Sequence, residues 1–76
     1  MEIKKVIKLT PYQVKDFVSA ATKCDFDVDI SYNRFTVDAK SMLGVFGLNF
    51  DCPLTVRYRG HNADFESYLS EHAVAC

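Results

Sequence analysis

The sequence is poor in several features that define large classes of protein. It has no tryptophan, three glycines and two prolines. No apolar run approaches the roughly 18 residues that a membrane-spanning helix needs. Residues 2–5 include two lysines and a glutamate, so the apolar segment of a signal peptide is missing after Met1. These absences predict a cytoplasmic protein that does not associate with a membrane.

An excess of either charge is also missing. Nine basic and ten acidic residues give a formal net charge of -1, whereas nucleic-acid-binding domains usually carry a basic face. The aromatic residues, Tyr12 among them, have too few basic neighbours for a base-stacking surface, and we expect them in the core or at its edges. No nucleic-acid partner is predicted.

Cysteine is scarce and irregularly placed. Cys24, Cys52 and Cys76 are odd in number and far apart, which argues against a disulfide framework. Neither His61 nor His72 stands at metal-ligand spacing from a cysteine, so no metal or other cofactor is predicted. The sequence also offers no carboxylate pair, Ser-His-Asp order or glycine-rich phosphate loop. We therefore do not expect an enzyme.

The sequence does contain enough apolar material for one core, with 49% hydrophobic and 25% charged residues in 76. We expect a single domain over residues 1–76, of modest stability. Alternating apolar residues predict four strands, and apolar residues three and four apart predict three helices. The predicted strands cover 3–9, 25–30, 35–39 and 54–59, and the predicted helices cover 10–21, 41–48 and 62–76.

Local signals mark where these elements begin. Thr10 and Pro11 are a typical N-cap and first helical residue, and Ser41 caps the short middle helix. Tyr32 and Asn33 form a tight turn, because asparagine tolerates positive φ. The order β-α-β-β-α-β-α predicts an α+β fold, an open-faced β-sandwich with three helices on one face of a four-stranded antiparallel sheet.

The opposite face of the predicted sheet is polar. Asp25, Asp27 and Asp29 alternate along one predicted strand and share this face, where Arg57 and Arg59 on another strand balance their charge. We favour this interpretation over a calcium site, which uses ligands arranged around a tight loop.

One segment carries a family resemblance. Residues 38–45 read Asp-Ala-Lys-Ser-Met-Leu-Gly-Val and resemble the Ala-Lys-Ser-hydrophobic segment of the HPr family, the histidine-containing phosphocarriers of the bacterial sugar phosphotransferase system. Phe17–Ala21 lies at the family's spacing from it, without gaps. The resemblance covers nearly the whole chain and implies strand order 1-4-2-3. In the family this segment starts the short second helix and contains a regulatory serine, which corresponds to Ser41.

The chain departs from that family between its first strand and first helix. HPr proteins have a Gly-Leu-His-x-Arg-Pro-like loop there, and its histidine becomes phosphorylated. Residues 8–13 of this chain read Lys-Leu-Thr-Pro-Tyr-Gln, with Thr10 in the place of the histidine and Tyr12 in the place of the arginine. His61 and His72 lie around the last predicted helix, far along the chain from this junction, and we expect neither to substitute for that histidine. A phosphohistidine relay needs an accessible imidazole and nearby donors, so a phosphocarrier is not expected.

In HPr proteins the first helix and the short middle helix form the docking face for protein partners. By this resemblance Met42, Leu43 and Phe46 would form an exposed partner-binding patch beside Lys40. The alternative is that the three apolar side chains pack inward. We therefore expect a protein-protein interaction or regulatory module. Two alternatives are a phosphotransferase-system component regulated by phosphorylation at Ser41, where a helix N-terminus favours a phosphate, and a self-associating structural subunit.

Overall fold

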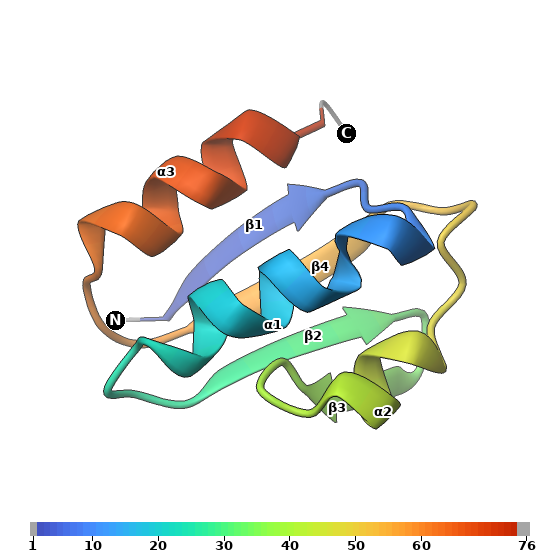
Figure 1. The fold of residues 1–76 in the computed structure, drawn as a ribbon, viewed down its shortest axis with the longest axis horizontal. Helices are drawn as coiled ribbons and strands as arrows, with labels where there is room; N and C mark the ends of the chain where they lie inside the picture. Colours follow the sequence, from blue (N-terminus) through green and yellow to red (C-terminus); the bar gives the residue numbers. More distant parts are fainter. Residues whose placement is uncertain (1, 75–76) are drawn as a thin grey trace.

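The computed structural model describes residues 2–74, and its elements follow the predicted order (Figure 1). These residues form four strands, three α-helices and one turn of 3-10 helix that runs directly into the first α-helix. The strands are β1 (Ile3–Ile7), β2 (Val28–Tyr32), β3 (Phe35–Asp38) and β4 (Leu54–Tyr58). The helices are η1 (Pro11–Gln13), α1 (Val14–Thr22), α2 (Met42–Phe46) and α3 (Ala63–His72).

The strands form one antiparallel sheet in the order β1-β4-β2-β3, which confirms the predicted order. All three α-helices lie on one face of this sheet, with α1 between α2 and α3, and the other face is uncovered (Figure 1). The α+β open-faced sandwich predicted from the sequence is therefore the fold of this protein.

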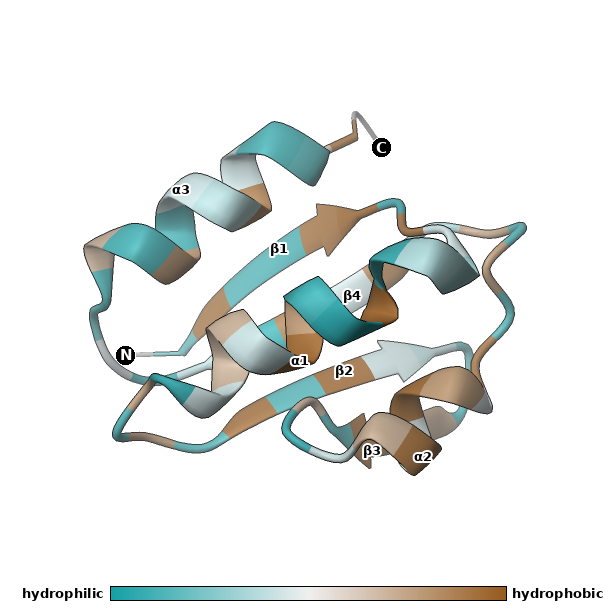
Figure 2. Cartoon of the chain, in the orientation of Figure 1, coloured by the Kyte–Doolittle hydropathy of each residue, from teal (hydrophilic) through white to brown (hydrophobic). Residues whose placement is uncertain are grey.

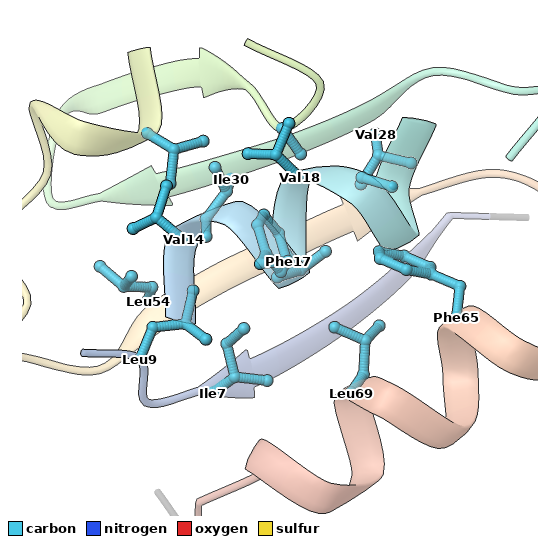
Figure 3. Packing of buried hydrophobic residues seen from close by; sticks show 14 of the residues in the cluster. Ile7, Leu9, Val14, Phe17, Val18, Val28, Ile30, Leu54, Phe65 and Leu69 are labelled. Carbon is cyan, nitrogen blue, oxygen red and sulfur yellow. The ribbon is translucent and has the colours of Figure 1, made fainter. Parts of the chain in front are cut away.

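The core lies between the sheet and the helices, and alternation along β4 shows how the sequence builds it. Leu54, Val56 and Tyr58 are buried as predicted, whereas Arg57 points to the uncovered face. Phe17 of α1 and Phe65 of α3 meet above the sheet, with 6.2 Å between their ring centroids (Figure 3). Each such side chain contributes about 1.5–3 kcal/mol when it is withdrawn from water.

The helices begin where local capping chemistry allows. Asn62 accepts a hydrogen bond from the Phe65 N–H (2.9 Å) and so caps α3. Thr10 and Pro11 begin η1 rather than α1, in a capping-box arrangement with Gln13. The Thr10 N–H donates to Gln13 Oε1 (2.9 Å), and the Gln13 N–H donates to the Thr10 carbonyl oxygen (3.0 Å).

Several predicted boundaries were wrong. β1 ends at Ile7 rather than Leu9, although Leu9 is buried. β2 begins at Val28, so Asp25 and Asp27 lie in the loop before it and only Asp29 belongs to the strand. The predicted continuation of the last helix to Cys76 falls outside the described residues, and α3 ends at His72.

The β2–β3 hairpin differs slightly from the prediction. Tyr32 still belongs to β2, and the two-residue turn consists of Asn33 and Arg34. Asn33 adopts the expected positive φ of 57°. None of the helices within residues 2–74 is long and apolar enough to cross a membrane.

Candidate functional site

The short helix α2 stands at the centre of the predicted docking face. Ser41 caps its five residues as predicted, since the Ser41 Oγ accepts a hydrogen bond from the Gly44 N–H (3.3 Å), and the helix ends at Phe46 with Gly47 as its C-cap. Only Val45 within the helix is fully buried. The helix lies beside α1 and over β3 (Figure 1). Because only one side chain of this five-residue helix points inward, its other apolar side chains are exposed to solvent.

Met42, Leu43 and Phe46 are all exposed, with 40%, 88% and 48% of their surfaces accessible. We call these three residues the apolar patch. Figure 2 shows α2 coloured as hydrophobic over most of its length, although it is a surface helix. Of the two arrangements weighed from the sequence, exposure is the one present, and inward packing is not.

Two further aromatic side chains are exposed that sequence reasoning had assigned to the core or its edges. Tyr12 in η1 is 94% accessible, and Phe35 in β3 is 69% accessible. Phe35 pairs with Tyr32 on the helix-covered face, but β3 is an edge strand and little covers its first residue. Alternation places a side chain on a face of the sheet; only the tertiary structure shows whether that position is covered.

Lys40 is already engaged within the chain. Its Nζ donates to the Cys24 carbonyl oxygen just after α1 (2.9 Å), and its N–H donates to Asp38 Oδ1 (2.9 Å). The side chain therefore ties the start of α2 to the end of α1. Burial raises the pKa of the nearby Cys24 thiol, and the Lys40 ammonium partly opposes that shift. A structural role accounts for Lys40 without a partner.

The junction between β1 and η1 opens into a hollow of about 500 Å³. Thr10, which stands where the HPr resemblance places a histidine, lines this hollow, and so does His72. Although His72 is far along the chain from the junction, the fold brings the two together, because the Lys8 N–H donates to the His72 carbonyl oxygen (3.0 Å). The remaining lining residues are Lys8, Leu9, Gln13, Phe50, Asp51, Glu71, Ala73 and Val74.

The imidazole of His72 is held firmly at the end of α3. Its Nδ1 lies 2.9 Å from the Tyr68 carbonyl oxygen, and its ring stacks on the Tyr68 ring at 4.3 Å. A carbonyl oxygen only accepts, so Nδ1 carries the proton and Nε2 is the unprotonated nitrogen of the neutral ring. Burial, with smaller contributions from Asp16 and Glu71, raises the pKa of Tyr68 to about 12.

His61 does not line this hollow and lies exposed in the loop before α3. Its Nδ1 is 3.0 Å from Glu66 Oε2, an exposed pair that contributes little to stability. Across residues 2–74, no three histidine, cysteine, aspartate or glutamate side chains gather as a metal-binding group would. Cys24 is buried, Cys52 is half-buried, and Cys76 lies outside the described residues.

The sheet order, the three helices on one face and the short helix α2 define an open-faced β-sandwich of the phosphocarrier type. A solved structure with this fold is that of the phosphocarrier protein HPr from Bacillus anthracis str. Ames. The two chains superpose with a TM-score of 0.69 at 20% identity, over 93% of this chain and 96% of that one. This likeness shows an HPr-like fold. No protein-family model and no curated protein sequence matches the chain.

Proposed function

We propose that this protein is an HPr-like interaction or regulatory module that binds a protein partner through the apolar patch on α2 and the adjoining surface of α1. The observation that carries the proposal is the exposure of Met42, Leu43 and Phe46 on one short helix. Grouped apolar side chains on the surface of a small protein usually mark a contact site. We further propose that the partner and the protein meet in the cytoplasm.

The shape of α2 supports this role. Gly44, in the interior of α2, weakens the helix by about 1 kcal/mol relative to alanine. Val45 nevertheless anchors it to the core, because its side chain is completely buried. A helix anchored by one inward residue can adjust the positions of its outward side chains when a partner binds.

We also propose that the protein is neither a phosphocarrier nor an enzyme. Residues 8–13 contain no histidine, and Thr10 is occupied in starting η1. His72 lies in the same hollow, but its Nδ1 is committed to the Tyr68 carbonyl oxygen and its ring is stacked on Tyr68. Glu71 and Asp51 also line the hollow, where their two negative charges outweigh the positive charge of Lys8 and would repel a phosphoryl group.

Docking through the apolar patch is tested by two matched substitutions, each of which introduces an aspartate at an exposed position. A partner is first captured from native cytoplasm, then purified and titrated against Leu43→Asp and, as control, Ser67→Asp at an exposed position of α3. Leu43→Asp should weaken binding by about 2 kcal/mol or more, roughly thirtyfold, without changing the melting temperature. Equal binding by wild type and Leu43→Asp would exclude the patch as the docking site.

A second candidate function is regulation by phosphorylation at Ser41. The Ser41 residue is exposed and its Oγ accepts from the Gly44 N–H, so the hydroxyl lies at the start of the helix. Ser41→Asp should change which partner is captured if the serine is a switch, while Ser41→Ala should capture the same partner as wild type. Identical capture by both variants and by wild type would reject the switch.

A further inference from the structure

We propose that the uncovered face of the sheet binds a second copy of this chain, face to face, through a row of charges that complements itself. Because Leu54, Val56 and Tyr58 point to the helices, the residues between them and their cross-strand partners point to the opposite face. No helix covers that face (Figure 1). This surface is separate from the apolar patch, and the proposal does not depend on the proposed function.

One charged residue from each strand lies in register across this face. Lys4 of β1 pairs with Arg57 of β4, Arg57 pairs with Asp29 of β2, and Asp29 pairs with Asp38 of β3. In the order of the strands the row therefore reads positive, positive, negative, negative. All four residues are exposed. The next row is uncharged and small, and consists of Val6, Thr55, Ser31 and Thr36.

These four charged side chains form no ion pairs with one another within 4.0 Å. Within residues 2–74 no lysine or arginine side chain lies within 4.0 Å of a carboxylate, and the one contact of this kind joins the His61 imidazole to Glu66, outside this row. Lys4 and Arg57 are like charges directly opposite each other, and so are Asp29 and Asp38. These two repulsions offset the attraction between Arg57 and Asp29, so the row adds little to the stability of the isolated chain. Opposite charges from outside would relieve both repulsions.

A second copy supplies those charges if a twofold axis runs parallel to the strands between β4 and β2. This axis places β1 over β3 of the copy and β4 over β2 of the copy. Lys4 then faces Asp38 of the second copy, and Arg57 faces Asp29 of the second copy, each twice by symmetry. An axis across the strands would instead place β1 over β1 and set like charges together. The row therefore specifies one orientation.

A second charge pair extends the same pattern. A shallow hollow of about 290 Å³ beside the row is lined by Asp27 and Arg59 in addition to Asp29 and Arg57, and Glu2 and Tyr58 complete its lining. Arg59 follows β4 and Asp27 precedes β2, so the same axis sets Arg59 over Asp27 of the second copy. Aligned face-to-face packing of two sheets is a common arrangement in β-sandwiches.

The contact is small, so the dimer should be weak. Four strands about 4.8 Å apart and at most five residues long span about 19 by 17 Å, less than the face of a stable dimer. The formal net charge of -1 offers little long-range repulsion. Because the attraction is electrostatic and the charges are exposed, dimers should dissociate as salt rises. We expect association at high protein concentration and low ionic strength.

Sedimentation velocity over a concentration series at low salt tests the proposal with charge reversals. Wild type should self-associate reversibly. Arg57→Asp alone and Asp29→Arg alone should each weaken association about tenfold or more, because each sets like charges face to face in the homodimer. Mixing these two variants should restore dimers, since their rows are complementary. Lys15→Asp on α1 makes the same charge change at an exposed residue on the helix side and should dimerise like wild type.

Circular dichroism of each variant shows that loss of dimers is not loss of folding. The proposal is overturned if wild type stays monomeric throughout, or if Arg57→Asp dimerises as well as wild type. It is also overturned if the mixed variants do not associate, or if Leu43→Asp alone abolishes the dimer, since the apolar patch would then hold the copies together.

Discussion

Gly60 should be among the least replaceable residues in the chain. It follows β4 and lies against the ring of Phe26, which stacks on Tyr58 with 5.7 Å between centroids and 20° between planes. A Cβ added at Gly60 would stand 2.2 Å from Phe26 Cδ2 and 2.5 Å from Phe26 Cγ. Because Cγ is next to the backbone end of that side chain, the ring cannot evade the methyl group by a small rotation.

Gly60→Ala must therefore displace the Phe26 ring from Tyr58. The lost aromatic pair is worth about 0.5–1.5 kcal/mol, and overpacking of this kind typically costs about 1–3 kcal/mol in total. For a domain of this size, each kcal/mol lowers the melting temperature by about 4–8 °C. Thermal unfolding followed by circular dichroism should show a drop of roughly 5–20 °C.

Two further variants identify the cause of that drop. Gly47→Ala is the control, because its added Cβ meets the Gly44 carbonyl oxygen at 3.3 Å, a tight contact but far less severe than the clash at Gly60, and it should melt within a few degrees of wild type. Phe26→Ala combined with Gly60→Ala should cost less than the sum of the single changes, because the clash needs both residues. A Gly60→Ala protein that melts like wild type would refute this packing.

Three other predictions concern single side chains. Tyr68→Phe should leave stability at neutral pH nearly unchanged, because within residues 2–74 its buried hydroxyl has no hydrogen-bond partner. The pKa of Tyr68 rises from about 10 in the unfolded chain to about 12 in the folded protein, so the free energy of unfolding of the wild type should fall between pH 10 and 12. Denaturant titrations at several pH values should show a smaller fall for Tyr68→Phe. Urea unfolding of Asn62→Ala should show a loss of about 1 kcal/mol in the free energy of unfolding. Thr10→Ala should lose less, because the capping bonds there join Gln13 to the Thr10 backbone, and an equal or larger loss would contradict this role of the backbone. Val45→Ala should cost about 2 kcal/mol and Leu43→Ala almost nothing by the same measurement, since they lie on opposite sides of α2.

The features that local chemistry determines could be predicted from the sequence. Ser41 and Asn62 were identified as helix starts because an N-cap depends on a side chain and on N–H groups only three residues away. Leu54, Val56 and Tyr58 were assigned to the core because a strand alternates strictly between two faces. The strand order needed more than periodicity, and it came from the family resemblance.

The features that depend on neighbours distant in sequence could not be predicted. His72 is 62 positions after Thr10 in the numbering, yet the two line one hollow because the end of α3 pairs with β1. Phe35 follows the alternation of a buried strand but stands at an uncovered sheet edge. Asp27 lies outside β2, and yet it joins Asp29 at the same hollow. In each case the missing information was which segments meet.

Our central proposal is that this protein binds a partner but does not carry phosphate. A phosphoenolpyruvate-driven phosphorelay tests it most directly. This protein and, as positive control, HPr from Bacillus anthracis are incubated with the relay enzymes, and acid-labile phosphate on each protein is followed by phosphorus NMR and mass spectrometry. Our account predicts a phosphorylated control and no phosphohistidine on this chain. Near-stoichiometric phosphate on wild type that disappears in His72→Ala would contradict the account and make His72 a phosphate acceptor.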